Sequence, residues 1–205
     1  MGGSMAMGAG HLLPDWLRIA WVVIFAVIVI VHARHIIDMG GQERAWHSGH
    51  VLMALGMIYM FLPGGIVTIP SAVGIAVFAL VAVAVASWIV YAIATQRSLD
   101  FLWVVMLVDM LGMTYMFVVQ QGAIGALVYL FAAYFAVEMG CWVFGAFNQT
   151  STEQRVIPIV VGGAAVALKA EARPLAEAST LGVRLTLGLM AAGMSYMFIA
   201  MLVGM

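Results

Sequence analysis

Six long apolar runs, separated by short polar breaks, constrain this chain more than any other feature. The runs cover residues 15–37, 46–62, 70–95, 100–119, 123–147 and 179–203. A helix needs about 20 mostly apolar residues to cross a bilayer. Of the 205 residues, 65% are hydrophobic and 8% are charged, which is too little polar surface for a water-soluble domain. The sequence therefore predicts an all-α membrane protein with six transmembrane helices.

The breaks between the runs suggest how this single membrane domain is organised. Residues 1–14 form a short tail that contains Met and His, 15–147 hold the first five helices, and 179–205 hold the sixth. The polar segment 148–178 lies between them and contains a thirteen-residue apolar patch over 156–168. Such a patch is too short to span a membrane comfortably, so we expect an interfacial or re-entrant helix there.

Basic residues indicate the orientation of the helices. Lys and Arg fall in the loops after the first, third and fifth runs and are absent from the loops after the second and fourth. Because cytoplasmic loops carry the excess of Lys and Arg, both termini should lie outside a plasma (inner) membrane. A net charge of −1 gives no general attraction to nucleic acid. The expected surroundings are the lipid bilayer, and the basic loops include Arg44, Arg97, Arg155, Lys169 and Arg173.

An internal repeat is the most informative motif. The sequences Gly56-Met-Ile-Tyr-Met-Phe61, Gly112-Met-Thr-Tyr-Met-Phe117 and Gly193-Met-Ser-Tyr-Met-Phe198 each lie in an outward-running helix. Three such copies predict three helical hairpins of one design, the third enlarged by the long polar segment. His32 and Trp88 lie the same number of residues before the first glycine of their motif copies. This spacing aligns His32-x-x-His35 of the first hairpin with Trp88-x-x-Tyr91 of the second.

Four histidines meet at the turn of the first hairpin. His32 and His35 share one helix face, and His47 and His50 share a face of the next helix. With a turn near residue 41, His35 should face His47 and His32 should face His50. Ionisable residues inside a membrane usually mark a functional path, and neutral imidazole is the commonest metal ligand. The sequence predicts a metal or cofactor site at this cluster.

Methionines form stripes at helical spacing in the three outward helices. If these helices surround one axis, the thioethers stack in layers, with Asp109 in the layer below. Thioether sulfur is soft and uncharged and selects Cu(I) over hard cations. Methionine at helical spacing is also ordinary core packing. The layers are Met57/Met113/Met194 and Met60/Met116/Met197, followed by Met53/Asp109/Met190.

Three further side chains are candidates for charge balance or proton exchange. Asp109 would lie near the bilayer centre, where a carboxylate costs about 2.5–3.5 kcal/mol on insertion scales. Glu138 and Cys141 lie at the cytoplasmic end of the fifth run. Cys141 is the single cysteine, so no intramolecular disulfide is expected.

Two resemblances follow from these motifs. The pairs Met53-xxx-Met57 and Met190-xxx-Met194 resemble the MxxxM filter of Ctr-type copper importers, although Asp109 and the six-helix count depart from that pattern. The opening His11–Arg18 stretch, the HxxH motif and His47-xx-His50-xx-Met53-Ala-Leu-Gly-Met57 resemble an actinobacterial family of small membrane proteins of unknown function. The first resemblance implies Cu(I) binding; the second implies membership of a family without an assigned activity.

Four functions are compatible with these residues. A membrane protein that transports or buffers Cu(I), alone or as a homo-oligomer and supplied by an extracytoplasmic metal chaperone, uses both the Met layers and the His cluster. A haem-binding redox protein would use the imidazoles as axial ligands, and a zinc-dependent intramembrane hydrolase would use them to activate water. A non-catalytic scaffold would use Met only for packing. We expect the copper function, and no catalytic residues.

Overall fold

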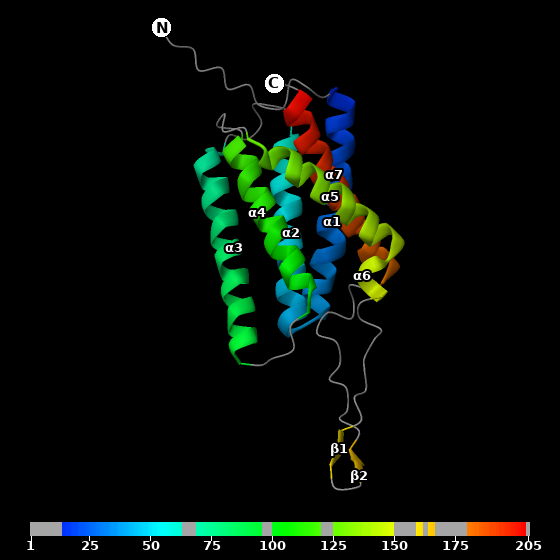
Figure 1. Ribbon diagram of the computed structural model, residues 1–205. Helices are drawn as coiled ribbons and strands as arrows, with labels where there is room; N and C mark the ends of the chain where they lie inside the picture. Colours follow the sequence, from blue (N-terminus) through cyan, green and yellow to red (C-terminus); the bar gives the residue numbers. More distant parts are fainter. Residues whose placement is uncertain are drawn as a thin grey trace.

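The computed structural model describes residues 14–62, 69–95, 100–119, 125–149, 159–161, 164–166 and 180–203. These residues form an elongated helical bundle with a small strand pair beyond one end (Figure 1). The all-helical class predicted for the membrane domain is confirmed. The helices are α1 (Asp15–Asp38), α2 (Gly41–Phe61), α3 (Ser71–Ala94), α4 (Leu102–Val119), α5 (Leu127–Phe144), α6 (Ala146–Gln149) and α7 (Leu181–Val203).

Five of the described helices are long and apolar enough to cross a membrane, namely α1, α3, α4, α5 and α7. Helix α2 has 21 residues but is not among them. It begins at Gly41, five residues before the predicted run, and its first turns contain Gln42, Glu43 and Arg44. Gly41 adopts φ +60°, a left-handed conformation that lets the chain reverse directly after α1.

The apolar patch 156–168 differs from the prediction in the residues that are described. Strands β1 (Ile159–Val161) and β2 (Ala164–Val166) pair antiparallel, with Ile159 opposite Val166. The predicted interfacial helix is therefore wrong for these residues. Val and Ile are β-branched and favour strands, a preference that a count of apolar residues does not register.

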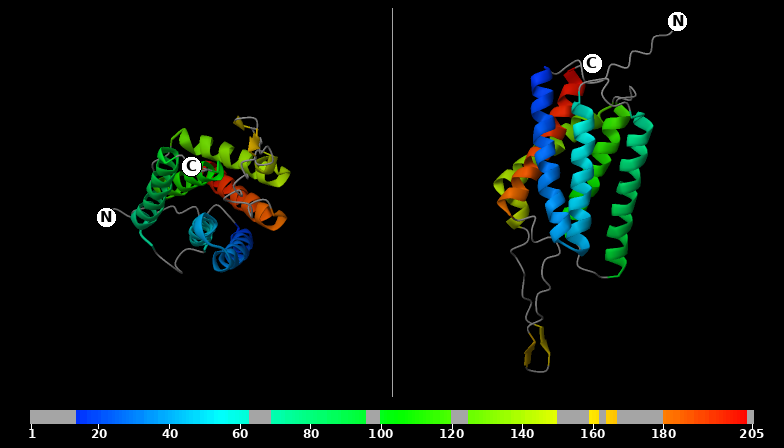
Figure 2. Two further views of the ribbon diagram at one scale, coloured as in Figure 1. Left: turned by 90° about the horizontal axis from the view of Figure 1, so that it is seen from below. Right: turned by 180° about the vertical axis from the view of Figure 1, so that it is seen from behind.

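Consecutive long helices pack in antiparallel pairs: α1 with α2, α3 with α4, and α5 with α7. Helix α1 begins and α7 ends at the same end of the bundle, here called the termini end; the α1–α2 turn lies at the opposite, turn end (Figures 1 and 2). Arginines hold two of these pairs together. Arg18 of α1 donates to the carbonyls of Phe61 and Leu62 where α2 ends, and Arg184 of α7 donates to those of Trp142 and Val143 where α5 ends.

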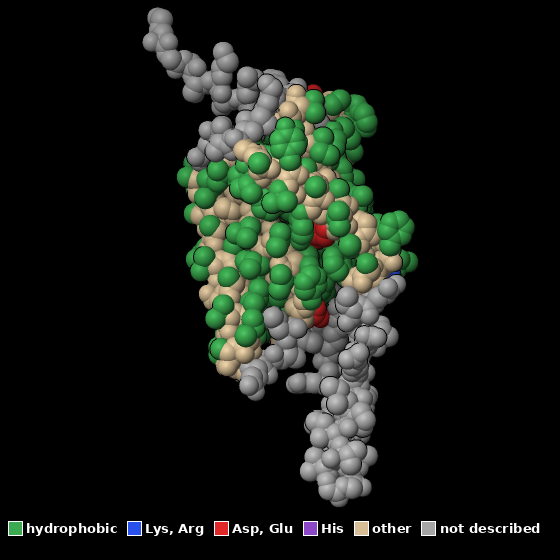
Figure 3. Space-filling view, in the orientation of Figure 1, with side chains coloured by type: hydrophobic (Ala, Val, Ile, Leu, Met, Phe, Trp, Pro, Cys, Tyr) green, Lys and Arg blue, Asp and Glu red, His purple; other side chains and the backbone are tan. Residues whose placement is uncertain are grey.

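The helices divide into an inner and an outer set. Only 22% of the apolar stretch in each of α1, α3 and α5 is buried in the bundle, against 61% in α4 and 67% in α7. The surface over α3, α4 and α5 is hydrophobic, with very few charged side chains (Figure 3). Side chains such as Leu80 and Val83 of α3 are exposed to the surroundings. This surface is suited to lipid, and the protein is membrane-embedded.

Candidate functional site

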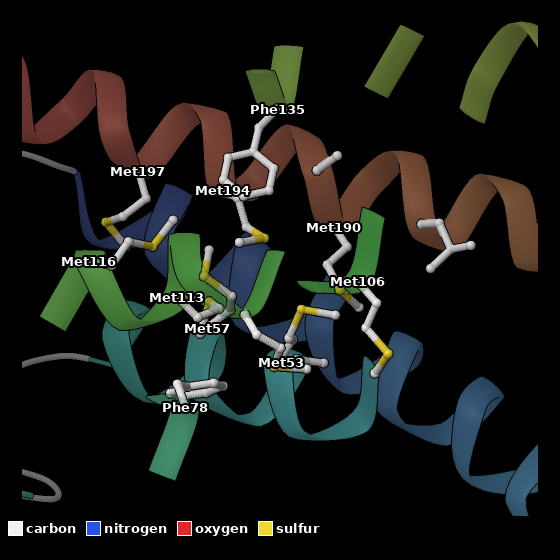
Figure 4. Packing of buried hydrophobic residues seen from close by; sticks show 14 of the residues in the cluster. Met53, Met57, Phe78, Met106, Met113, Met116, Phe135, Met190, Met194 and Met197 are labelled. Carbon is white, nitrogen blue, oxygen red and sulfur yellow. The ribbon is translucent and has the colours of Figure 1, made fainter. Parts of the chain in front are cut away.

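Buried methionines from α2, α4 and α7 line the centre of the bundle. Figure 4 shows Met116 beside Met197, then Met57, Met113 and Met194 together, then Met53 beside Met190 and Met106. The labelled methionines of each predicted layer thus lie together, and Met106, which shares the helical spacing of Met113 and Met116 on α4, lies beside them. Met60 is half-buried and packs against the same cluster. The other seven predicted methionines are at most 3% exposed: Met53, Met57, Met113, Met116, Met190, Met194 and Met197.

The glycine of each repeated motif lies against a phenylalanine ring of another helix pair. A Cβ added at Gly56 of α2 would lie 2.6 Å from Cζ of Phe78 in α3. The corresponding distance is 2.7 Å between Gly112 of α4 and Phe135 of α5, and 2.6 Å between Gly193 of α7 and Phe25 of α1. Each glycine therefore admits a ring into space that any side chain would fill, and the three contacts run cyclically around the bundle.

The same three phenylalanines also stack on the last residue of the motif in their own helix pair. The ring centroids are 5.9 Å apart for Phe25 and Phe61, 5.7 Å for Phe78 and Phe117, and 5.9 Å for Phe135 and Phe198. Stacked aromatic rings of this kind resist rearrangement because their packing is dense and directional. They fix the rotation of the helices and so direct the methionines that follow each glycine toward the axis.

A small, partly open cavity lies next to the methionine layers, toward the turn end. Its volume of about 10 Å³ suffices for roughly one water molecule or one small ion. Its polar lining comes from three helices: His50 of α2, Asp109 of α4 and Glu138 of α5. Met190 and Met194 of α7 complete the wall, so imidazole, carboxyl and thioether groups meet at one point.

The two carboxyl groups at this cavity are buried and only partly satisfied. Asp109 accepts a hydrogen bond from the hydroxyl of Tyr134 at 3.2 Å, and Glu138 Oε1 accepts one from the indole of Trp142 at 3.0 Å. Glu138 Oε2 is buried and has no hydrogen-bond partner among the described residues. Because an unpaired buried carboxyl oxygen is costly, the cavity favours a cation, a proton or a water molecule beside it.

The histidines form the compact cluster that their spacing predicted. The rings of His35 and His47 stack at 4.8 Å, and those of His32 and His50 stack at 5.3 Å, so both predicted pairs are confirmed. In addition, the Nδ1 atoms of His32 and His47 are 2.8 Å apart. His32, His47 and His50 are buried, whereas His35 is half-buried at the turn end.

Hydrogen bonds assign the tautomers of these imidazoles. Thr186 Oγ1 donates to the carbonyl of Val183, so it accepts from Nε2 of His32 at 3.2 Å. Neutral His32 then accepts at Nδ1 the proton that His47 donates. His50 donates from Nδ1 to the carbonyl of Trp46 at 2.8 Å. The Nε2 lone pairs of His47 and His50 are therefore free to bind a proton or a metal ion.

The arrangement does not assemble a metal centre from nitrogen and oxygen ligands alone. Across the described ranges, no set of three or more His, Cys, Asp or Glu side chains is arranged to hold one metal ion. His32 and His47 use their Nδ1 atoms on each other. Cys141 is a free, half-buried thiol one turn from Glu138 and is not part of the cavity wall. A soft metal ion bound here would need the thioether sulfurs of methionine as ligands.

Comparison with curated proteins gave no match, and comparison with solved structures gave none either. The resemblance to Ctr-type importers stays a prediction. The resemblance to a family of unknown function is confirmed, because a family model described as Domain of unknown function (DUF5134) matches residues 42–201. This match covers α2 to α7 and includes His47, His50 and all three copies of the repeated motif. The chain belongs to the DUF5134 family.

Proposed function

We propose that this protein binds Cu(I) in the membrane and transports or buffers it along the axis that the methionine layers surround. The observation that carries the proposal is the convergence of thioethers from three separate helices at the centre of the bundle (Figure 4), next to the cavity that His50, Asp109 and Glu138 line. Uncharged, polarizable sulfur suits a soft monovalent ion and offers little to a hydrated hard cation.

We infer that the three helix pairs are copies of one hairpin related by a pseudo-threefold axis, and that α2 is a sixth span. The cyclic Gly–Phe contacts support this, since Gly56, Gly112 and Gly193 each receive a ring from the next pair at nearly the same distance. Threefold placement suits Cu(I), because a layer such as Met57/Met113/Met194 offers one thioether from each copy to an ion on the axis.

The carboxyl groups supply what the methionine layers lack, which is negative charge. A layer of neutral sulfur leaves the charge of a monovalent ion uncompensated in a medium of low dielectric constant. Asp109 and Glu138 line the cavity that Met190 and Met194 also border, so an ion leaving the layers would meet an opposite charge there. The free Nε2 of His50 offers a further ligand at the same place.

The histidine cluster would continue the path from this cavity to the turn end. His50 lines the cavity and stacks on His32, which bonds to His47, which in turn stacks on half-buried His35. By the basic-loop rule the turn end is the cytoplasmic side, so the path would connect outer sulfur ligands with inner nitrogen ligands. A Met/His tail outside could receive the ion from a metal chaperone.

The alternative functions have weaker support. A porphyrin needs imidazoles on its two opposite faces, and the paired rings here stack at 4.8 and 5.3 Å with no room between them. A zinc hydrolase needs three nitrogen or oxygen ligands on one ion, and the described side chains are not arranged in that way. A scaffold that uses Met only for packing accounts for the layers but not for buried Asp109 and Glu138 beneath them.

Copper content of the purified protein tests the proposal. Full-length protein is equilibrated with Cu(I) against a competing chelator, and bound copper is measured by elemental analysis. Wild-type protein should retain copper, and the variant Met57→Leu/Met113→Leu/Met194→Leu should bind it at least about a hundredfold more weakly, since even outer-sphere changes cost roughly 10–100-fold. Leu nearly preserves the volume of Met, so each change should cost less than about 1.5 kcal/mol of stability.

Met110→Leu is the matched control. Met110 is as deeply buried on α4 as Met113 but lies outside the repeated ladder. It should bind copper like the wild type. Wild-type protein that retains no copper above background, or a triple variant that retains as much as the control, would end this proposal.

A further inference from the structure

A large apolar slot opens between α2, α3 and α4 at the turn end, away from the methionine axis. Its volume is about 710 Å³, within the range of roughly 300–1,000 Å³ that is usual for small-molecule sites. Leu52 of α2, Val81 and Val85 of α3 and Met106 of α4 form its apolar wall. Two indoles, Trp88 and Trp103, line it as well, with centroids 6.3 Å apart.

Small residues keep the slot open. Helix α2 presents Gly41, Ala45, Ser48 and Gly49 to it, and α3 presents Ala84. Among the described helices, α3 packs extensively only against α4. Near the termini end the ring of Phe78 bridges from α3 to Gly56 of α2, but at the turn end no such side chain crosses.

The other two boundaries between helix pairs are filled at this depth. Tyr134 of α5 bonds to Asp109 of α4 across one of them. His32 of α1 bonds to Thr186 of α7 across the other. Across the third boundary the contacts at this depth come from α4, where Trp103 bonds to Gln42 and Met106 packs on Gly49, so the open space is confined to the side of α3.

The lining has a definite chemistry. Among the described residues that line it, no side chain is charged. Gln42, at the turn end of the slot, accepts a hydrogen bond from Trp103 at 3.2 Å through its carbonyl oxygen, which leaves the two N–H donors of its amide to offer. The indole nitrogen of Trp88 is buried without a hydrogen-bond partner in the described part of the chain. Because that nitrogen is inaccessible from the slot, the donors offered to a ligand are those of Gln42, at one end of a long apolar wall.

We propose that this slot binds a neutral membrane lipid whose head is a flat, carbonyl-bearing ring, the chemical class of the membrane quinones. A carbonyl oxygen would accept from the amide of Gln42, and the ring would lie against the indole faces of Trp88 and Trp103. The apolar tail would run along Val81 and Leu52 toward the bilayer interior. The absence of charge in the lining disfavours fatty acids and phospholipid heads, and the site is independent of the proposed copper path.

Quenching of indole fluorescence by decylubiquinone tests this assignment. Full-length protein in phosphatidylcholine nanodiscs is titrated with the quinone, and the variant Ala84→Phe fills the slot from α3. Overpacking should weaken binding at least about tenfold. Val83→Phe is the matched control, because Val83 is the neighbouring residue on α3, is exposed and does not line the slot. It should quench like the wild type, and copper content should be unchanged in both variants.

A second variant and a competitor complete the test. Gln42→Leu removes the amide donors and should weaken quinone binding while the slot stays open. Monoolein, a neutral lipid without a ring, should compete poorly. Quenching that never saturates, that is the same in Ala84→Phe and Val83→Phe, or that an equal amount of monoolein abolishes would overturn the proposal.

Discussion

The two halves of the bundle are built differently. Near the termini end, the three helix pairs repeat one set of contacts, in which a glycine receives a phenylalanine ring and methionines follow toward the axis. Near the turn end, each boundary between pairs differs: one is crossed by the His32–Thr186 hydrogen bond, one by the Tyr134–Asp109 hydrogen bond, and one contains the apolar slot. The similar contacts thus lie in one half of the bundle, and the contacts that differ from pair to pair lie in the other.

Substitution of the glycines in the repeated motif should change the stability of the protein most, compared with a glycine outside the motif. Ala at Gly193 would bring a Cβ within 2.6 Å of Phe25, and overpacking of this kind costs about 1–3 kcal/mol. Ala at Gly140 of α5 meets nothing within 4 Å and should stabilise the helix by about 0.5–1 kcal/mol. Unfolding in mixed detergent micelles measures both. Gly56→Ala and Gly112→Ala should match Gly193→Ala, and three unequal losses would break the comparison.

Histidine substitutions should separate the buried cluster from its edge. His32→Ala leaves His47 without its acceptor and Thr186 without its donor, which should cost about 1–3 kcal/mol. His35→Ala removes a half-buried ring with a stacking contact and should cost less than about 1 kcal/mol. Thermal unfolding of both variants, followed by circular dichroism, checks the order. Equal losses would mean that the cluster is not held by the His32 network.

Removal of one carboxylate should weaken copper binding without removing it. Asp109→Asn removes the carboxyl group that would balance the charge of a bound ion at the cavity beside the methionine layers, and it should weaken Cu(I) binding about tenfold, a moderate share of a close ion–charge interaction. Asp100→Asn is the control, because Asp100 accepts from the backbone N–H of Leu102 at the start of α4 and Asn can do the same. Chelator competition measures both. An Asp109→Asn protein with wild-type affinity would exclude charge compensation there.

The smallest effect is expected from Tyr134→Phe. The change removes the hydroxyl that donates to Asp109 at 3.2 Å and should destabilise the fold by about 0.5–1.5 kcal/mol. Tyr129→Phe, at an exposed position about one and a half turns away on α5, should be nearly neutral. Equilibrium unfolding of the two variants measures the difference. If Tyr134→Phe loses no stability, the boundary between α4 and α5 is held by packing alone and not by this hydrogen bond.

Much of the bundle follows from local sequence properties. Run length and polar breaks place the long helices to within a few residues, because a spanning helix needs a minimum apolar length. The facing histidine pairs follow from helical spacing and a tight turn, since residues equidistant from the turn meet in an antiparallel pair. The side of each inner helix that carries Met follows from the 3.6-residue period.

Contacts between pairs were harder to predict. Nothing in the spacing of Asp109 and Glu138 indicates that they share a cavity, because they lie on helices whose relative rotation is set by distant rings. The alignment of Trp88 with His32 assumed equal loops, whereas the α3–α4 connection is longer than the α1–α2 turn. The Gly–Phe contacts instead make Phe25, Phe78 and Phe135 equivalent positions. Val85 lies as far after Phe78 as His32 lies after Phe25, so Val85, and not Trp88, is the equivalent of His32.

An open slot that exists because its lining residues are small is harder still to predict from the sequence. The slot beside Trp88 exists because Gly41, Ala45, Gly49 and Ala84 are small, and small residues in apolar helices are usually sites of close helix packing. Sequence reasoning would place another helix there. Only the position of α3, held away from α2 at the turn end, distinguishes an open slot from a packed interface.

X-ray absorption at the copper edge tests the central claim most directly. Full-length protein loaded with one equivalent of Cu(I) in lipid nanodiscs would reveal the atoms bound to the metal. We expect a first shell dominated by sulfur, and its loss in the Met57→Leu/Met113→Leu/Met194→Leu protein but not in Met110→Leu. A shell of nitrogen and oxygen alone, unchanged by the triple substitution, would contradict a methionine path for copper.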